Sequence, residues 1–529
     1  MKRLAFRRLA GFALAALIAG GPLVMAPAMA QPAPAPAAAA PEAAPAPAAT
    51  PEATTAAAPA APAAAAPAAP AAEIAAPART VDKGDTAFMI VSTVLVLLMI
   101  VPGLALFYGG LVRQKNMLSM LMQVSTTGVI GMIAWAFWGY SLSFTDGGAH
   151  DLFFGGLSRL FMAGLQGTSG VASTAIVGTF STGVYIPELV FFCFQMTFAA
   201  ITATLVLGSV AERIKFSAVV AFAFLWPLLV YYPIAHMVWW WAGPDTVATH
   251  PHDPIQAGFI WGRGAIDFAG GTVVHINAGI AALIACLLLG PRKGYGTEAM
   301  PPHSLVMSLI GAGLLWVGWF GFNAGSNLEA NAYAGLAMAN TFLATAAAGF
   351  SWVVTEWVIR KKASMLGLAS GLVAGLVAVT PAAGFAGPIG SIFLGFLVSP
   401  ICVISVGAVK NMFKYDDSLD AFGIHGVGGM VGAIATGFLV NPAWGGAGIV
   451  DYTTCAADGD ISTCDVAPYN MLNQLVSQLW GVGTTIVWCA IGSLIVFGLI
   501  KYTIGLRVKP DVDEEGLDIT EHGERAYHV

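Results

Sequence analysis

Charged side chains are scarce in this sequence. Asp, Glu, Lys and Arg make up 10% of its 529 residues, against about 25% in an average soluble domain. Hydrophobic residues make up 57%, and the mean hydropathy is +0.76. A water-soluble chain could not bury so much apolar surface, so the composition predicts an integral membrane protein. No basic patch of useful size accompanies the net charge of −6, so no nucleic-acid partner is expected.

Cysteine motifs are absent as well. The six cysteines include no C-x-x-C pair, so a zinc or thioredoxin-type site finds no support. We expect no metal site and no cofactor. No cysteine precedes Cys193, which excludes a lipoprotein anchor.

The N-terminal 80 residues carry two features of exported proteins. Residues 1–30 combine a basic start, the apolar run "LAGFALAALIAG" and "AMA" at 28–30, which predicts a signal peptide, with a retained membrane anchor as the alternative. Residues 31–80 are almost entirely Ala and Pro. Such a tract has nothing to pack with, and its prolines prevent a long helix, so a disordered linker is predicted.

Beyond the linker, apolar runs recur in blocks of about 20 residues, the length that crosses a bilayer. They predict an all-α membrane domain over 81–508 and a tail over 509–529. Eleven spans are expected: 86–112, 116–142, 186–210, 216–241, 268–290, 304–325, 334–359, 364–383, 387–409, 420–440 and 471–504.

Lys and Arg are divided unequally between the two sides of these spans. Fifteen of these residues lie on one side, either in every second connection between spans or at and beyond the end of the last span. The other side holds only Arg79, Lys83, Arg159 and Arg263. Basic residues mark the cytoplasm. We therefore expect a multi-pass protein of the cell inner membrane, with its mature N-terminus in the periplasm and its C-terminus in the cytoplasm.

The stretch "CAADGDISTC" follows span ten, on the side that this topology places outside the cytoplasm. Oxidation is possible there, so Cys455 and Cys464 are predicted to form a disulfide. Two free thiols are the alternative.

Two apolar stretches each carry an acid and a histidine: "DFAGGTVVHINAG" at 267–279 and "DAFGIHGVGGMVGAIATGFL" from Asp420. They begin spans five and ten, which indicates two inverted five-helix repeats plus one C-terminal helix, with a site between the repeats. Ionisable residues at lipid depth are functional candidates. For His275 and His425, the alternative is two unrelated neutral side chains, each bonded to a backbone carbonyl.

Asp267 stands at a helix start, where a carboxylate can accept backbone N–H bonds. A structural cap is favoured there over direct substrate binding, and both stay open. Two sets of residues each share a helix face by their spacing: Phe194 with Phe198, and Trp319 with Phe322 and Ser326. Trp239, in "HMVWWW", lies at the outer end of span four. Singly, such aromatics form a membrane belt, but together they could form a cage for a small cation.

The sequence closely resembles the Amt/Mep/Rh ammonium transporter family, in its bacterial Amt branch. The matching blocks span about residues 82–528: "PGLALFYGGLVRQKN", "LGSVAERIKFSAV", "DFAGGTVVHINAG", "GWFGFNAGS", "DAFGIHGVGG" and "EGLDITEHGERAY". The Ala/Pro segment and the extended loop at 143–185 depart from the family pattern. The resemblance implies a transporter rather than an enzyme, a homotrimer in the lipid bilayer, and one pore per subunit.

The resemblance also assigns roles to individual residues. It implies an ammonium recruitment site at Phe198, Trp239 and Ser326, supported by Asp267. It further implies a phenyl gate of Phe198 and Phe322, pore histidines His275 and His425, and vestibule residues Phe194 and Trp319. Ammonium, or methylammonium as its analogue, would lose a proton and cross as neutral ammonia. For the tail "EGLDITEHGERAYHV", the resemblance implies docking of a P-II-type signalling protein. The alternative is that the tail packs only on the loops of its own chain.

Three rival functions stay open. A redox enzyme could hold haem or metal on the histidines, although no third or fourth histidine is expected at matching depth. An ammonium sensor could use the same fold, and a water or gas channel could use the same pore.

Overall fold

The computed structural model describes residues 79–167, 170–455 and 461–527. The predicted signal peptide and nearly all of the predicted linker lie outside these residues.

Eleven helical segments in the described residues are long and apolar enough to cross a membrane. Each corresponds to one predicted span, and every end lies within four residues of its predicted position. The all-α membrane fold and the number of spans are therefore confirmed. The segments are Lys83–Leu111, Gln114–Phe144, Glu188–Ser209, Phe216–Trp239, Gly271–Leu289, Leu305–Gly325, Ala332–Arg360, Met365–Ala382, Pro388–Phe413, Phe422–Leu439 and Met471–Thr503.

Five spans consist of one long α-helix, in two cases extended by a final 3-10 turn: α6 (Glu188–Val206), α11 (Leu305–Gly325), α12 (Ala332–Arg360), α13 (Met365–Val379) and α17 (Met471–Thr503). The other six contain a wider π-helical turn. These are α2 (Lys83–Leu98), η1 (Met99–Leu104) and α3 (Ala105–Leu111); α4 (Met117–Ala134), η3 (Trp135–Gly139) and α5 (Tyr140–Phe144); α7 (Phe216–Trp226), η7 (Pro227–Tyr231) and α8 (Tyr232–Trp239); η9 (Gly271–Ile276) and α10 (Asn277–Leu289); α14 (Pro388–Ile404), η11 (Ser405–Val409) and α15 (Lys410–Phe413); η12 (Phe422–Gly426) and α16 (Val427–Leu439).

Proline accounts for two of the π-helical turns, because Pro102 lies within η1 and Pro227 opens η7. Proline has no N–H to donate along the helix, and its ring crowds the preceding turn. The π-helical turns η9 and η12 contain no proline and instead carry His275 and His425. Single π turns inside membrane helices are frequent at functional sites.

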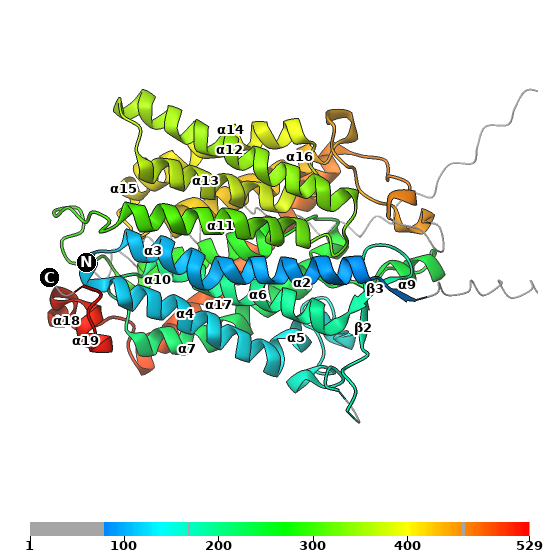
Figure 1. Cartoon of the computed structure of the whole chain (residues 1–529), viewed down its shortest axis with the longest axis horizontal. Helices are drawn as coiled ribbons and strands as arrows, with labels where there is room; N and C mark the ends of the chain where they lie inside the picture. The colour runs from blue at the N-terminus through cyan, green and yellow to red at the C-terminus, as the bar shows by residue number, and fades with distance from the viewer. Residues whose placement is uncertain (1–78, 168–169, 456–460, 528–529) are drawn as a thin grey trace, which may run out of the picture. The chain divides into compact units, whose positions relative to one another are not determined.

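The spans lie side by side along a common direction (Figure 1). One end of the bundle, called the tail face below, carries the short helices α18 (Pro510–Glu515) and α19 (Leu517–His522). The opposite end, the loop face, carries α9 (Pro244–Thr249) and three short strands.

The three strands are a small departure from the all-α prediction. They are β1 (Thr80–Val81), β2 (Ile176–Gly178) and β3 (Val184–Pro187), in the order β1-β3-β2. β1 runs parallel to β3 and β2 antiparallel to it. The sheet joins the chain before the first span to the long loop at 143–185. The predicted disulfide between Cys455 and Cys464 is also present on the loop face.

The two histidine-bearing spans cross in close backbone contact. A methyl group added at Gly279 of α10 would overlap the backbone nitrogen and Cα of Gly426, at the end of η12. Glycine at the crossing lets the two helices approach closely. Of the eleven spans, the one containing α10 is the most deeply buried. Span five therefore lies at the centre of the bundle.

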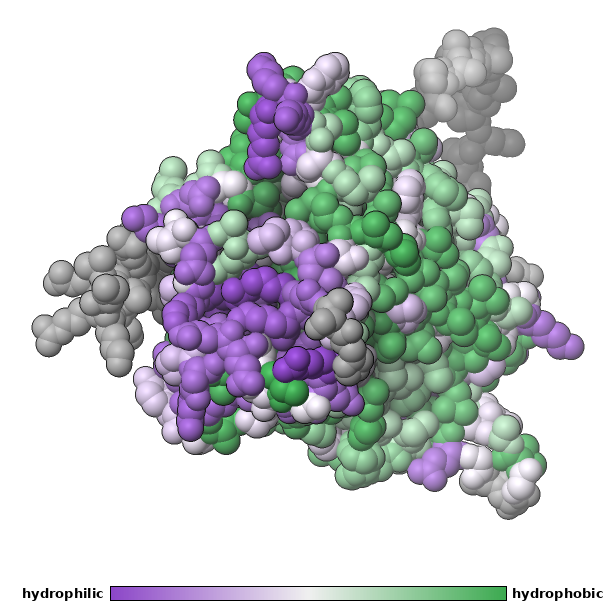
Figure 2. Space-filling view, turned by 60° about the vertical axis from the view of Figure 1, so that its left-hand side comes forward, coloured by the Kyte–Doolittle hydropathy of each residue, from purple (hydrophilic) through white to green (hydrophobic). Residues whose placement is uncertain are grey.

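The C-terminal tail packs on the connections of its own chain. The N-terminal turns of α4 and α7 have no capping side chain of their own. Asp518 instead accepts hydrogen bonds from the backbone of Leu118 and Ser119, at 3.0 and 2.8 Å, and Glu521 accepts one from Phe216 at 3.0 Å. Figure 2 shows the hydrophilic tail face beside an apolar flank of the bundle.

Candidate functional site

The two histidines predicted from the sequence lie against each other. Their Nδ1 atoms are 3.2 Å apart, and their rings are nearly parallel, with centroids 5.3 Å apart. Both side chains are buried. A hydrogen bond between two Nδ1 atoms needs one donor and one acceptor, so at least one ring is neutral. This contact does not fit the alternative of two unrelated histidines bonded to backbone carbonyls.

A buried carboxylate caps the start of each histidine-bearing helix. The carboxylate of Asp267 accepts hydrogen bonds from the backbone N–H groups of Gly270, Gly271 and Thr272 at 2.9, 2.6 and 2.7 Å, and from the Thr272 hydroxyl. Since both oxygens are occupied in this way, the geometry favours the structural cap over direct substrate binding. Asp267 also contacts the candidate cage through its carbonyl, which accepts the indole N–H of Trp239 at 2.9 Å.

In span ten the residue that corresponds to Asp267 is Asp417. The sequence comparison matched Asp420 to Asp267, and that match was wrong. Asp417 accepts the backbone N–H groups of Ala421 and Phe422 at 3.0 and 2.8 Å. Asp420 instead forms an ion pair with Lys410 at 2.8 Å. Asp267 and Asp417 each precede their histidine by eight residues, so the spacing could have identified the pair. Burial, opposed by Lys410, raises the pKa of Asp417 to about 6.

Two stacked phenyl rings separate the histidines from the loop face. Phe198 of α6 and Phe322 of α11 lie with their centroids 4.1 Å apart and an interplanar angle of 21°. The Phe322 ring in turn lies 6.0 Å from that of His275. Trp319 stacks on His275 at 5.4 Å and donates its indole hydrogen to Thr380. The rings thus form a continuous aromatic wall that ends at the histidine pair.

The residues predicted as a cation cage adjoin this stack. The Trp239 ring meets Phe198 edge-on, with centroids 5.8 Å apart, and Phe194 lies 4.9 Å from Phe198 on the same helix. Ser326 lies one turn beyond Phe322 and donates its hydroxyl hydrogen to the Phe322 carbonyl at 2.8 Å. The hydroxyl oxygen keeps its lone pairs for a donor such as ammonium.

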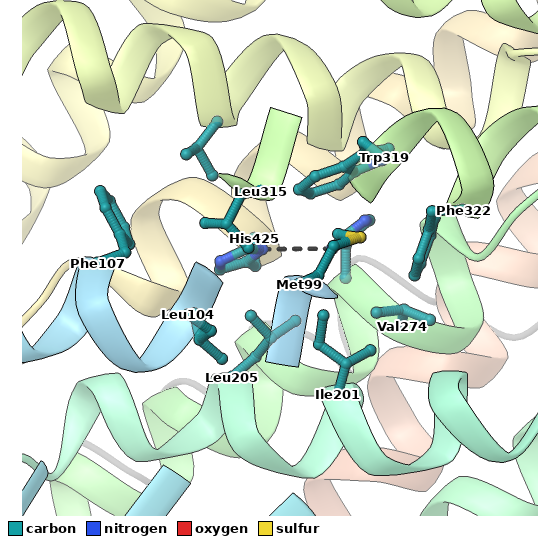
Figure 3. Close-up of a pocket in the computed structure, with 12 residues that line it drawn as sticks. Met99, Leu104, Phe107, Ile201, Leu205, Val274, Leu315, Trp319, Phe322 and His425 are labelled. Carbon is teal, nitrogen blue, oxygen red and sulfur yellow. Dashed lines mark hydrogen bonds between the residues drawn. The ribbon is translucent and has the colours of Figure 1, made fainter. Parts of the chain in front are cut away.

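A small cavity lies between the phenyl stack and the tail face (Figure 3). Its volume is about 10 Å³, close to the minimum for a single water-sized guest. Phe322 lies on one side of the cavity and Phe107 on the other. Twelve residues line it: Met99, Leu104, Phe107, Ile201, Leu205, Val274, His275, Leu315, Trp319, Phe322, Val373 and His425. Two imidazoles and one indole are therefore the only polar side chains in an otherwise apolar wall.

Comparison with known proteins identifies the family. A sequence profile described as Ammonium Transporter Family matches residues 87–527. The chain belongs to this family. Of the relatives named below, those of Aquifex aeolicus and Bacillus subtilis are ammonium transporters rather than enzymes.

Relatives of the ammonium transporter family cover most of this chain. An ammonium transporter of Aquifex aeolicus is 43% identical over 450 residues, which cover 85% of this chain and 94% of the relative. One from Bacillus subtilis is 41% identical and covers 84% of this chain and 98% of its own length. Among solved structures, Saccharomyces cerevisiae Mep2 matches with a TM-score of 0.67 and 29% identity, covering 81% of this chain and 90% of Mep2. A protein described as a sensor Amt protein matches with a TM-score of 0.69 and 26% identity, covering 83% and 98%.

Sequence reasoning did not single out the far side of the cavity. Phe107 stands in the block "PGLALFYGG", yet nothing in its spacing distinguishes it from the neighbouring apolar residues. Ile201, Leu205 and Leu315 were unremarkable for the same reason. Only packing of α3, α6 and α11 around one point reveals them as lining residues. In the residues that the structure describes, no group of three or more His, Cys, Asp or Glu side chains is arranged to hold a metal.

Proposed function

We propose that this member of the ammonium transporter family recruits ammonium at a cage of Phe198, Trp239 and Ser326, deprotonates it, and passes ammonia through the cavity lined by His275 and His425. The observation that carries the proposal is the bonded histidine pair in an apolar cavity of about 10 Å³. Membership of the family supports ammonium as the substrate. The apolar cavity supports passage in the form of neutral ammonia.

The cage suits a cation. Ring faces attract ammonium with about 0.5–2 kcal/mol each, the larger value applying when water is excluded. The Ser326 hydroxyl donates its hydrogen to the Phe322 carbonyl. The lone pairs of its oxygen are therefore free to accept an N–H of ammonium. Methylammonium keeps the charge and three N–H donors, so it serves as an analogue.

The cavity beyond the phenyl stack suits a neutral guest. A small ion that enters a low-dielectric space unpaired incurs a penalty of at least several kcal/mol. Potassium and sodium have no proton to lose, so their charge remains when the water is removed. Ammonium can lose a proton, and the resulting ammonia can hydrogen-bond to the imidazole edges of His275 and His425. Phe198 and Phe322 would act as the gate and Phe194 as part of the vestibule wall. Trp319, expected in the vestibule, instead stacks on His275 and lines the cavity beyond the gate.

The orientation and assembly belong to the same proposal. The distribution of Lys and Arg supports a cytoplasmic tail face and a periplasmic loop face in the inner membrane of a bacterium. The family resemblance supports a homotrimer and docking of a P-II-type protein near the tail. Chemical cross-linking of the protein in membranes tests the trimer, because a ladder that stops at three subunits is expected.

A flux assay tests the function. Purified protein in proteoliposomes should take up methylammonium, in competition with ammonium, and should give no potassium flux. A protein that binds ammonium without flux would act as a sensor. One that passes water but no methylammonium would act as a water channel. Either result would overturn the proposal.

A further inference from the structure

Gln478 is a buried amide in α17, the C-terminal helix that lies outside the two predicted repeats. Its side-chain oxygen accepts hydrogen bonds from the backbone N–H of Ile266 at 2.8 Å and from the side chain of Gln474 at 3.2 Å. Its side-chain nitrogen donates to the carbonyls of Ile266 and Ala433, at 3.0 and 2.7 Å. A glutamine side chain has two acceptor and two donor positions, so Gln478 uses all four of them.

These bonds hold the residue that comes immediately before the helix cap Asp267. Gln478 pairs with both the N–H and the carbonyl of Ile266, as two opposite residues of antiparallel strands do, and so fixes the peptide planes on either side of Ile266. The next residue, Asp267, caps its helix with the carboxylate and holds the Trp239 indole with its carbonyl. The position of the Trp239 ring in the candidate cage therefore depends on the position of Ile266.

Span ten fixes the orientation of the Gln478 side chain. Ala433, which accepts one of its hydrogen bonds, lies in α16, eight residues beyond His425. Gly437 lies one turn further along α16, and a methyl group added there would lie 3.1 Å from Cγ of Gln478 and from Cδ2 of Leu475. This close packing leaves the Gln478 side chain little room to adopt another rotamer.

The corresponding residue of span ten is also held from another part of the chain. Asp416 precedes the cap Asp417, as Ile266 precedes Asp267. The Asp416 carbonyl accepts a hydrogen bond at 2.6 Å from the buried guanidinium of Arg213, which lies between spans three and four. In both halves a buried polar side chain from another span or connection thus anchors the residue before the cap. This repetition indicates that both histidine-bearing helices need an anchored start.

We infer that Gln478 is a positioning residue for ammonium recognition: it sets the affinity of the cage by holding Ile266 and, through Asp267, the ring of Trp239. This role rests on the proposed function, because it concerns the affinity of the proposed cage. Attraction between a cation and a ring is confined to about 6 Å from the ring centroid, so a displaced Trp239 ring binds ammonium less well. Ala433 lies inside α16, which its own helical hydrogen bonds hold, so the histidine pair should depend less on Gln478.

Hydrogen–deuterium exchange of the purified full chain tests the anchoring without any need for transport. The variant is Gln478→Leu and the control is Gln123→Leu, because Gln123 is equally buried in α4 and donates to Ser119 of its own helix at 3.0 Å. Backbone amides of residues 264–273 should exchange about fivefold faster for each hydrogen bond lost in Gln478→Leu. The control should exchange like wild type over the same residues.

Methylammonium uptake in proteoliposomes tests the role in affinity. The half-saturation should rise several-fold in Gln478→Leu, by no more than in Trp239→Leu, with a maximal rate near that of wild type. Both changes act through the same ring, so Gln478→Leu should cause no further rise when Trp239→Leu is already present. Gln123→Leu should match wild type in both quantities.

Unchanged exchange or unchanged half-saturation in Gln478→Leu would overturn the inference, as would a full additive rise in the double variant. If Gln478→Leu aggregates on gel filtration, Gln474→Leu takes its place, because Gln474 donates to Gln478 and to the Gly264 carbonyl at 2.9 Å. Wild-type behaviour of Gln474→Leu in both measurements would then overturn the inference. If wild type took up no methylammonium, the proposed function would fail, and the exchange comparison would still decide whether Gln478 anchors the segment.

Discussion

At the scale of single residues, the site divides into residues that pattern could identify and residues that it could not. Phe198 and Trp239 were found through spacing and through the resemblance of long sequence blocks. Asp417 was missed because Asp420, which lies closer to His425, was compared with Asp267 instead. The eight-residue spacing to the histidine, which Asp267 and Asp417 share, would have identified it. Phe107 was missed because a residue that lines a cavity has no local signal when every neighbour is apolar too.

Trp239→Leu tests the cage. Removing one ring face forfeits about 0.5–2 kcal/mol of attraction for a cation, so the half-saturation of ammonium transport should rise several-fold or more. Trp444→Leu is the matched control, because Trp444 lies on the loop face with 55% of its surface exposed. Half-saturation measured by electrophysiology should not move in the control. An unchanged value in Trp239→Leu would mean that Trp239 belongs only to the membrane belt.

Glu212→Gln tests a buried charge network on the tail face. Arg113 and Arg292 approach the Glu212 carboxylate at 2.7 and 3.5 Å. Burial acts to raise the pKa of Glu212, but Arg292 and Arg113 outweigh it, so the pKa lies below the usual value. The folded protein then binds fewer protons than the unfolded chain. The stabilisation by Glu212 is therefore present above about pH 4.3, and it is lost as the pH falls through the lowered pKa.

The neutral variant leaves Arg113 without its counter-charge, whereas Arg292 keeps its ion pair with Asp416 at 2.9 Å. Breaking a buried ion pair costs about 3–5 kcal/mol. Thermal unfolding in detergent should show Glu212→Gln as less stable at pH 7, with a smaller loss on acidification than wild type. Glu298→Gln, at an exposed position, is the control. A variant that unfolds like wild type at both pH values would show that the network contributes nothing to stability.

At the scale of elements, span positions were predictable because the bilayer imposes them. An apolar block of about 20 residues must begin and end near the two interfaces, and all eleven spans follow this rule. The π-helical turns at His275 and His425 were not predictable, because they depend on how spans five and ten pack. The short sheet escaped prediction since strands of two to four residues carry too little periodicity.

Gly279→Ala tests the crossing that brings the histidines together. The added methyl group would overlap the Gly426 backbone, and overpacking of this kind costs about 1–3 kcal/mol. The helices should move apart and lengthen the contact between His275 and His425. We expect a lower unfolding temperature and reduced ammonium flux.

Gly313→Ala is the matched control for this change, because Gly313 lies in α11 with no atom near its added methyl group. Alanine also favours the helix there over glycine. If Gly279→Ala matched this control in both stability and flux, the close crossing would have no part in the pore.

At the scale of the whole molecule, the C-terminal tail packs against the first turns of two membrane helices, α4 and α7. Asp518 and Glu521 cap α4 and α7 from outside those helices. Sequence reasoning left open whether the tail packs on its own loops or receives a partner. The structure shows the tail packed on its own chain, and the P-II-type partner stays a prediction.

Deleting residues 509–529 tests the partner. A cognate P-II-type protein should be captured by the full chain and lost with the deletion. Gel filtration of the deleted form serves as the control for folding. Equal capture by both forms would remove the tail from the interaction.

Electrophysiology on solid-supported membranes can compare wild type directly with His275→Ala/His425→Ala. Pulses of ammonium and of potassium are applied to each. Wild type should give ammonium current without potassium current. The double variant should lose the ammonium current or admit potassium, because the hydrogen-bonded imidazole pair, with Nδ1 atoms 3.2 Å apart, is gone. Full ammonium current with intact potassium exclusion in the double variant would mean that the two histidines serve only as core packing.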